Sequence, residues 1–259
     1  GSPQGARPKA LVYRDPVNLE FSTQDSDQHE AWLIKFPAQQ EHPEVCAIEA
    51  VYAECLRLCA IETPDTHFFN LPNGLTAFAS KRFDRQNGMR IPMQSLAAYT
   101  GADYKVPGSL DYRNFLRATL MCTQDVRERL HAFKRAVFNV LFNNRDDHTK
   151  NFSFLMEKNG QWKLAPAYDV TFCEGPGGYH QMDIMGEALN ISRNDIHKLG
   201  TSEANLTTLE VDEIILTMRE IALQFSQIAQ RLYPHQIRES TLQMIQSRIQ
   251  QNIDFLTET

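Results

Sequence analysis

The stretch NRDDHTKNFSFLMEKNGQWKLAPAYDV, residues 144–170, decides the fold of this 259-residue chain. In it, Asp146 is followed by Lys150 and Asn151, and a further carboxylate, Asp169, comes after two strand-like runs. No other part of the chain orders acidic, amide and basic residues in a way that needs a chemical explanation. This order of residue types is therefore the first indication of what the chain does.

The two runs, 152–156 and 162–165, are predicted to form a β-hairpin. Between them lies Asn159-Gly160, a dipeptide that is typical of two-residue hairpin turns. With these two as the turn residues, Lys158 pairs with Gln161. The same register places Asn151 opposite Tyr168 and Lys150 opposite Asp169, so the hairpin brings Asn151 and Asp169 together.

Composition excludes some classes of function. The net charge of -6 and the pI near 5.8 argue against a chain that binds nucleic acid alone, so any contact with DNA would need a partner. No run approaches the roughly 18 apolar residues of a membrane span. We therefore expect no membrane association.

Five cysteines, an odd number, fit reduced thiols in a cytoplasmic protein that is large enough to fold without disulfides. Cys55 and Cys59 are four residues apart on a predicted helix, a spacing that would suit a metal pair. No further His or Cys follows at ligand spacing, so burial in the core is the favoured interpretation.

The N-terminal third reads as strands and one helix. A glycine-containing loop, 1–9, leads into a strand at 10–13, and a second strand covers 31–36 with Lys35 near its end. The apolar spacing over 44–60 predicts a helix on which Glu49 lies beside the apolar stripe. A carboxylate there needs a cation, and Lys35 is the obvious candidate.

The pattern becomes mainly helical after a strand at 75–79, whose continuation KRFDR (81–85) is charged. We place a lobe boundary there, with an N-lobe at 1–82 and a C-lobe at 83–259. The glycine-rich loop 174–178 could contact a substrate or partner, although a plain surface loop is the simpler interpretation. Helices are expected at 93–100, 112–122, 126–142, 209–232 and 234–256.

Phosphoryl transfer from a nucleotide explains this set of residue types. A carboxylate and an amide oxygen hold magnesium, an aspartate accepts the proton of the attacking hydroxyl, and a lysine balances phosphate charge. Protein kinases order these parts as a glycine loop, a strand lysine, a helix glutamate, an Asp-x-x-x-x-Asn loop and a metal-binding Asp. The chain supplies them in that order as Gly5, Lys35, Glu49, Asp146 with Asn151, and Asp169.

A competing interpretation takes Asp146, Asp147 and His148 as the metal ligands of a phosphohydrolase or nuclease. It explains the DDH triplet but gives no role to Lys35 or Glu49. Adjacent residues also rarely converge on one ion. The kinase interpretation is therefore favoured, and His148 is expected to pack the catalytic loop.

Several of these pieces resemble the kinase core of the HipA-type serine/threonine kinases of bacterial toxin–antitoxin systems. They cover the first two thirds of the chain and include Glu49 in its helix. The matching segments are SPQGARPKALV (2–12), WLIKFP (32–37), KRFDR (81–85), NRDDHTKNFSF (144–154) and LAPAYDV (164–170).

The resemblance implies an α+β, bilobal, protein-kinase-like fold with a small β-rich N-lobe and a larger helical C-lobe. It also implies dependence on ATP and Mg²⁺. The implied roles are catalysis by Asp146 as the base, with Lys150 and Asn151 in the same loop; metal binding by Asn151 and Asp169; nucleotide binding by Gly5, Ala6, Lys35 and Glu49; an adenine-holding hinge at Lys81 to Phe83; and autophosphorylation of Ser2.

Members of this family inhibit growth by phosphorylating an aminoacyl-tRNA synthetase and are held in check by a helix-turn-helix antitoxin. The resemblance implies such partners here, with DNA reached only through the antitoxin. Full-length members carry a subdomain of roughly 100 residues before the glycine loop. We expect either that this chain is a fragment or that a small separate protein replaces that subdomain. A pseudokinase-like module that binds nucleotide and antitoxin is the alternative function.

Overall fold

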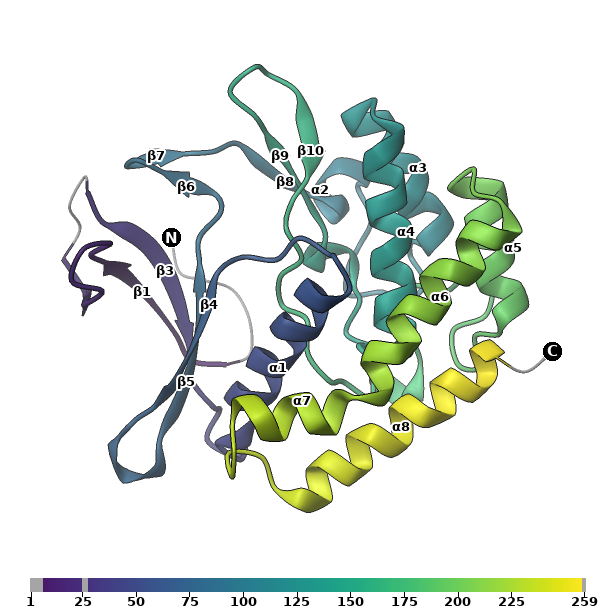
Figure 1. Ribbon diagram of the computed structural model, residues 1–259. Helices are drawn as coiled ribbons and strands as arrows, with labels where there is room; N and C mark the ends of the chain where they lie inside the picture. The colour runs from purple at the N-terminus through teal and green to yellow at the C-terminus, as the bar shows by residue number, and fades with distance from the viewer. Residues whose placement is uncertain (1–6, 25–27, 258–259) are drawn as a thin grey trace.

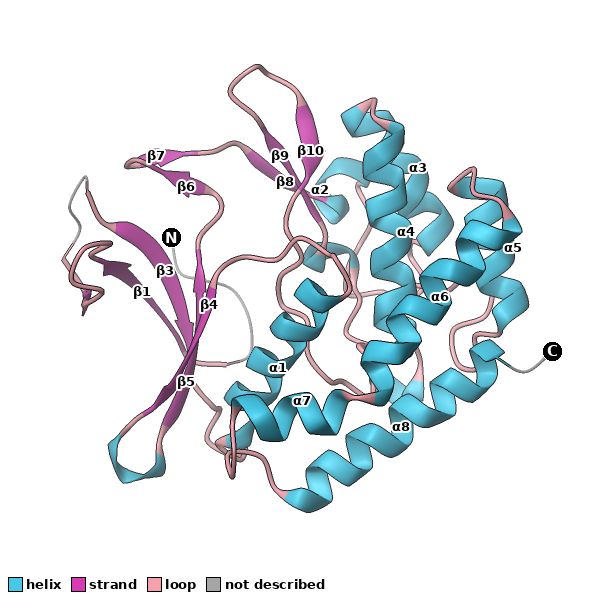
Figure 2. Cartoon of the chain, in the orientation of Figure 1, coloured by secondary structure: helices cyan, strands magenta, loops and turns pink. Residues whose placement is uncertain are grey.

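The computed structural model of the chain describes residues 7–24 and 28–257. It has a twisted β-sheet at one side and a larger helical part at the other, with one helix between them (Figure 1). Helix and strand content in these two parts is shown in Figure 2. Ser2, Gly5 and Ala6, which the sequence assigns to the glycine loop, lie outside the described residues.

The sheet is antiparallel, with five strands in the order β2-β1-β3-β5-β4. Alternation of side chains places Trp32 and Ile34 in a buried cluster on one face, whereas Lys35 and Phe78 face the helix α1. The strands are β1 (Lys9–Arg14), β2 (Phe21–Ser22), β3 (Glu30–Lys35), β4 (Thr66–Asn70) and β5 (Thr76–Lys81), and α1 spans Glu44–Leu58. The strands predicted at 10–13, 31–36 and 75–79 and the helix at 44–60 are thus confirmed.

Helix α1 is part of the main hydrophobic core. Ile48, Val51 and Tyr52 are buried in it together with the helices that follow. These are α2 (Leu96–Thr100), α3 (Tyr112–Thr123), α4 (Val126–Leu141), α5 (Arg193–Glu203), α6 (Thr208–Leu223), α7 (Phe225–Leu232) and α8 (Glu239–Thr257). Cys55 and Cys59 are buried in the same core, as expected for core-filling residues, and burial raises the pKa of both thiols.

Two short β-structures connect the sheet to the helices. The hairpin of β6 (Arg85–Gln86) and β7 (Met89–Arg90) turns at Asn87 and Gly88, which have φ values of 50° and 73°. A three-stranded sheet then joins β8 (Met93–Ser95), β9 (Ser153–Met156) and β10 (Trp162–Leu164) in the order β10-β9-β8.

The predicted hairpin is present, but its predicted register is wrong by one residue. Trp162 pairs with Met156 and Glu157 with Gln161, so three residues form the loop. Within this loop only Gly160 has a left-handed backbone conformation, with φ at 84°. The same sequence is compatible with a two-residue turn and with a three-residue loop, and the structure has the three-residue loop. Pairing stops before Asn151, which lies in a 3₁₀ turn, Thr149–Asn151.

Other boundaries also differ. The predicted helix at 93–100 is wrong in its first half, because Met93 belongs to strand β8 and pairs with Leu155 of β9. The helix α2 begins only after Ser95, whose side chain caps its N-terminus. The helix predicted at 209–232 is divided at Gln224, and the last helix begins at Glu239. Strand β4 and helix α5 were not predicted. None of the helices in the part of the chain that the structure describes has the length and apolar character that crossing a bilayer requires.

Candidate active site

A buried lysine joins the two parts of the molecule. The Nζ atom of Lys35, at the end of β3, lies 2.5 Å from Oε1 of Glu49 on α1 and 2.5 Å from Oδ1 of Asp169. Lys35 is only 5% exposed, whereas the side chain of Asp169 keeps 44% of its surface exposed. The predicted pairing of Glu49 with Lys35 is confirmed, and Asp169 completes a charged triad open to solvent on one side.

The charges of the triad support one another. Burial disfavours the ammonium form of Lys35, but the charges of Glu49 and Asp169 outweigh this and raise its pKa. Burial likewise raises the pKa of Asp169, and the Lys35 ammonium more than offsets it, so that the pKa of Asp169 is lowered. Lys35 and Asp169 are therefore both charged at neutral pH.

Asp169 is held in an uncommon backbone conformation, with φ at 58°. The segment after it returns to the catalytic loop, where Asn144 bridges Cys173 and the backbone N–H of Arg145 donates to the Cys173 carbonyl at 3.2 Å. This pairing, rather than the hairpin register, brings Asp169 near Asp146. A strained residue held by its surroundings is common at functional sites.

The loop from Asp146 to Asn151 is closed by its own amide. Nδ2 of Asn151 donates to the backbone carbonyl of Asp146 at 2.7 Å, and the backbone N–H of Asn151 donates to the His148 carbonyl at 2.9 Å. The Asp146 side chain is half exposed. Burial, only partly offset by His148, and the nearby carboxylates Asp169 and Asp147 raise the pKa of Asp146. A raised pKa suits a group that must accept a proton.

Asp147 is fully buried and bonded to three donors. Its Oδ2 accepts from the Tyr112 hydroxyl at 2.7 Å and lies 2.8 Å from Nδ1 of His180, while Oδ1 accepts from the backbone N–H of Gln181 at 2.7 Å. The side chain anchors the catalytic loop to α3 and to the segment at 180–181. Its oxygens are thus not available for an ion shared with Asp146, as the phosphohydrolase interpretation requires.

His148 and Lys150 pack against one aromatic ring. The His148 ring meets the Tyr104 ring at a centroid distance of 5.8 Å, and Nζ of Lys150 lies 3.5 Å from the centroid of the same ring. Nε2 of His148 is also 3.8 Å from Oδ1 of Asp146. The expectation that His148 packs the catalytic loop is confirmed.

The predicted hinge residues lie at the exit of the sheet. Nζ of Lys81 forms an ion pair with Glu30, and the Phe83 ring packs on Tyr168, the neighbour of Asp169, with centroids 5.5 Å apart. Tyr168 in turn donates its hydroxyl to the Lys150 carbonyl at 2.7 Å. Through the side chain of Tyr168, Phe83 is thus connected to the catalytic loop at Lys150 and to the neighbouring Asp169.

Comparisons with known proteins identify the family of the chain. The sequence model of the HipA-like C-terminal domain matches residues 1–231. The chain belongs to this family. The HipA-like chain is also 25% identical over 167 residues, 56% of its length, to a Haemophilus influenzae protein named "Putative kinase", of which the match covers 46%.

Two solved structures resemble the HipA-like chain in fold. Shewanella oneidensis HipA, in its complex with HipB and operator DNA, has a TM-score of 0.77 at 16% identity, over 98% of this chain and 64% of that one. The Helicobacter pylori proinflammatory kinase CtkA has a TM-score of 0.57 at 14% identity, over 88% and 85%. The expected kinase-like α+β fold is confirmed. The chain spans about half the length of the H. influenzae relative and about two thirds of the S. oneidensis protein.

Two residues of the HipA-like site were quoted in a motif but given no role by sequence reasoning. Arg7 donates from Nη1 to Glu49 at 3.3 Å and from Nε to Glu41 at 2.8 Å. Lys9, opposite Lys35 in the sheet, lies close enough to Asp169 to feel its charge, and burial lowers its pKa. The signal was available in RPK at 7–9, a basic run at the start of a strand.

The residues present are of the chemical type that fits a magnesium ion. The amide nitrogen of Asn151 is engaged with the Asp146 carbonyl, so its Oδ1 is the atom that remains for a cation, and the carboxylate of Asp169 keeps 44% of its side-chain surface exposed. Hard oxygen donors of this kind suit Mg²⁺, which usually takes its other ligands from phosphate and water. Among the residues that the structure describes, no group of three or more His, Cys, Asp or Glu could hold a metal alone.

Proposed function

We propose that the chain is an ATP- and Mg²⁺-dependent serine/threonine protein kinase, the toxin of a bacterial toxin–antitoxin system. The observation that carries the proposal is the triad of Lys35, Glu49 and Asp169, which joins a sheet lysine, a helix carboxylate and a second carboxylate beside Asp146. The phosphohydrolase interpretation gives this arrangement no role.

Each residue has a definite task in this proposal. Asp146 accepts the proton of the attacking hydroxyl, for which its raised pKa and half-exposed carboxylate are suited. Lys35, oriented by Glu49, holds nucleotide phosphates, as do Gly5 and Ala6 of the glycine loop. Lys150 balances charge near the transferred group, and Phe83 with Lys81 borders the adenine. Asn151 and Asp169 would hold Mg²⁺, which would neutralise part of the phosphate charge.

The test is phosphoryl transfer from labelled ATP to a protein acceptor. We expect label with the wild-type chain and a loss of at least about 100-fold in Asp146→Asn and in Asp169→Asn. Glu213→Gln, which neutralises an exposed carboxylate on α6, is the matched control and should label normally. Equal labelling of all four proteins would exclude this assignment of the site.

The same experiment separates the alternative function. A pseudokinase-like module would bind ATP in a filter assay with an affinity that depends on Lys35 yet transfer no label. The raised pKa of Asp146 favours transfer, because a module that only binds nucleotide needs no carboxylate that accepts a proton.

The proposed partners follow the family resemblance. The substrate would be a protein such as an aminoacyl-tRNA synthetase, and the regulator a helix-turn-helix antitoxin that connects the kinase to DNA, as HipB does for S. oneidensis HipA in its operator complex. A small separate protein could supply the preceding subdomain. Mass spectrometry of cell proteins phosphorylated after brief expression identifies the substrate, and absence of any new phosphosite in wild type relative to Asp146→Asn would contradict a protein-kinase function.

We also propose that the kinase phosphorylates itself on Ser2. Phosphate at that position would lie near the nucleotide phosphates and weaken ATP binding by repulsion. Undiminished ATP affinity in the phosphorylated chain would contradict the assignment.

A further inference from the structure

Next to the catalytic loop lies a cavity, lined in part by Arg145, that the proposed reaction does not use. It has a volume of about 350 Å³ and is open to solvent. One buried water needs only ~10–15 Å³ of such a cavity, so this one has room for a group much larger than a water molecule. We call it the arginine pocket, after residues that line it: Arg145, Leu189, Asn190, Arg248, Asn252 and Phe255.

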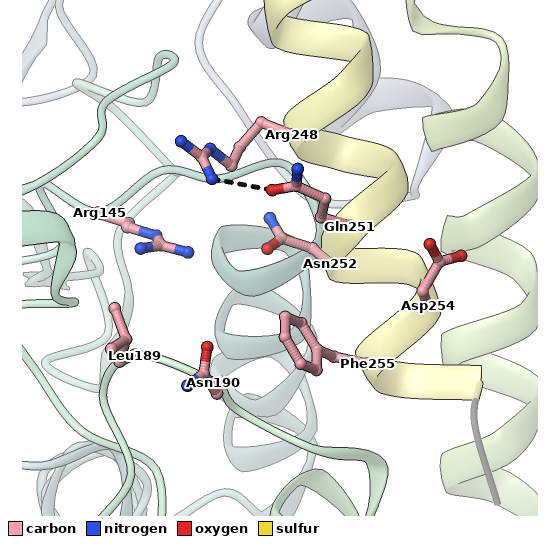
Figure 3. Close-up of a pocket in the computed structure, with 8 residues that line it drawn as sticks. All are labelled: Arg145, Leu189, Asn190, Arg248, Gln251, Asn252, Asp254 and Phe255. Carbon is pink, nitrogen blue, oxygen red and sulfur yellow. Dashed lines mark hydrogen bonds between the residues drawn. The ribbon is translucent and has the colours of Figure 1, made fainter.

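Two guanidinium groups from distant parts of the chain line this pocket. Figure 3 shows the Arg145 side chain extending into it from the catalytic loop and Arg248 projecting over it from α8. The Asn252 amide points into the same space, whereas Asp254 points away from it (Figure 3). The inner part of the pocket is therefore positively charged.

Arg145 is the unusual member, because its charge is buried without a carboxylate partner. It is 7% exposed, its Nη1 donates to the Gly178 carbonyl, and its Nε has no hydrogen-bond partner in the described part of the chain. Burial and the nearby Arg248 charge lower its pKa. A buried cation with an unused donor can bind an anion that reaches it.

The carboxylates nearby are already engaged. Glu174 accepts from Nη2 of Arg248 at 3.2 Å, and Asp147 is held by its three donors. Arg248 also donates to Gln251 at 2.8 Å, which orients its guanidinium over the pocket (Figure 3). No acidic side chain of the described residues forms a hydrogen bond or ion pair with Arg145, so its charge is left for a ligand.

We propose that the arginine pocket is a binding site for a phosphate dianion, held by Arg145 and Arg248. Phosphate matches this site because its several oxygens accept from two guanidinium groups at once. The phosphate is either free or carried on a phosphorylated serine or threonine, and the pocket has room for the attached residue.

An occupied pocket would act on the catalytic loop. Arg145 immediately precedes Asp146, and both guanidinium groups hold the glycine-rich loop 174–178, Arg145 through Gly178 and Arg248 through Glu174. A phosphate competes for these same donors and so changes how that loop is held. The effect on catalysis rests on the proposed function, whereas phosphate binding does not.

The experiment is calorimetric titration of the chain with inorganic phosphate, and separately with N-acetyl-phosphoserine amide. Because phosphate could also enter the Lys35 site, binding is compared in Lys35→Gln, Arg248→Gln and Arg231→Gln. Arg231 is exposed on α7, outside the pocket, and its replacement makes the same change of charge. We expect Arg248→Gln to weaken binding by about tenfold or more, as loss of one charge-assisted contact predicts.

The expected pattern is binding that is unchanged in Lys35→Gln and Arg231→Gln and about tenfold or more weaker in Arg248→Gln. Binding that disappears in Lys35→Gln but is unchanged in Arg248→Gln, or no saturable binding by either probe, overturns the proposal. Tighter binding of the phosphoserine probe than of phosphate assigns the site to a phosphorylated residue, and the reverse assigns it to the free anion.

Hydrogen exchange then tests the coupling. Added phosphate should change amide exchange over 173–180 in wild type and in Asp146→Asn, and leave it unchanged in Arg248→Gln. Unchanged exchange in a wild-type chain saturated with phosphate refutes the coupling. Because Asp146→Asn transfers no phosphate under the proposed function, this result stands or falls independently of kinase activity.

Discussion

Replacing Asp147 by asparagine changes a single atom type inside the buried network that fixes the catalytic loop. The aspartate accepts three hydrogen bonds, two at Oδ2 and one at Oδ1. The backbone N–H of Gln181 can only donate, so the asparagine must keep its oxygen there. Its NH₂ group then faces Tyr112 and His180.

The cost follows from what those two partners can do. His180 can present an unprotonated Nδ1 to the new donor by changing its tautomer. The Tyr112 hydroxyl already accepts from Asn139 at 2.9 Å, so its own proton loses its acceptor. One buried donor is left unsatisfied, which costs about 1–3 kcal/mol. Relief of the desolvation of a buried charge reduces this cost, and we expect about 1–2 kcal/mol for the substitution.

Urea denaturation of wild type, Asp147→Asn and Asp147→Ala measures this directly. The alanine variant orphans all three donors and should lose about 3–5 kcal/mol. Asp125→Asn is unsuitable as a control because Asp125 caps α4, so the control is Glu213→Gln, which should change stability by less than about 0.5 kcal/mol. An Asp147→Ala variant as stable as wild type would refute the account of the network.

Three further predictions concern stability and pH. Glu44→Gln, at the start of α1, should lower Tm at pH 7 by roughly 3–8 °C, since the buried carboxylate accepts from Arg238 and Thr241. Folding lowers the pKa of Glu44 below 4.5, because the hydrogen bonds from Arg238 outweigh the effect of burial. The stabilisation that Glu44 gives the folded state is therefore complete above pH 4.5 and is lost as the pH falls through the folded-state pKa. The Tm difference between wild type and Glu44→Gln should accordingly shrink in acid. In urea denaturation, Gly175→Ala should lower the free energy of unfolding by ~1–3 kcal/mol more than Gly160→Ala does. A Cβ at 175 would lie 2.2 Å from the Tyr179 carbonyl oxygen, whereas no described atom lies within 4 Å of a Cβ at 160. Equal losses of stability in the two variants would contradict this close approach. The acid limb of the phosphoryl-transfer rate should lie above pH 3.8, and His148→Ala should move it further up, since the His148 charge lowers the pKa of Asp146; an unmoved limb would exclude Asp146 as the base.

The part of the site that could be predicted from sequence consists of residues on short segments with a clear strand or helix pattern. Alternation on β3 placed Lys35 on the face toward α1, and helical spacing placed Glu49 beside the apolar stripe, so their contact followed from two short segments. The order of Asp146, Asn151 and Asp169 was equally legible. These residues belong to strands, helices and loops whose type can be predicted from a few neighbouring residues.

The part that could not be predicted depends on long-range geometry. Asp147 finds Tyr112 and His180 at separations of 35 and 33 residues, and no local pattern indicates either. The approach of Asp169 to Asn151 was predicted from a hairpin register that proved wrong. The bridge of Asn144 to Cys173 is what returns the segment after Asp169 to the catalytic loop. A turn sequence that permits two loop lengths cannot fix such a register.

The packing of α1 bears on how this site works. Its Tyr52 is buried against the helical part and donates to the Phe142 carbonyl, next to the catalytic loop, at 2.5 Å. Against the sheet, α1 contributes a much smaller cluster around Cys46, Ala50 and Phe78. Glu49 is therefore fixed relative to Asp146, and Lys35 arrives on the more weakly attached element. Movement of the sheet over α1 would make or break the contact of Lys35 with Glu49 while Asp146 and Asp169 stay in place, so the lysine is the part of the site that such a motion would control.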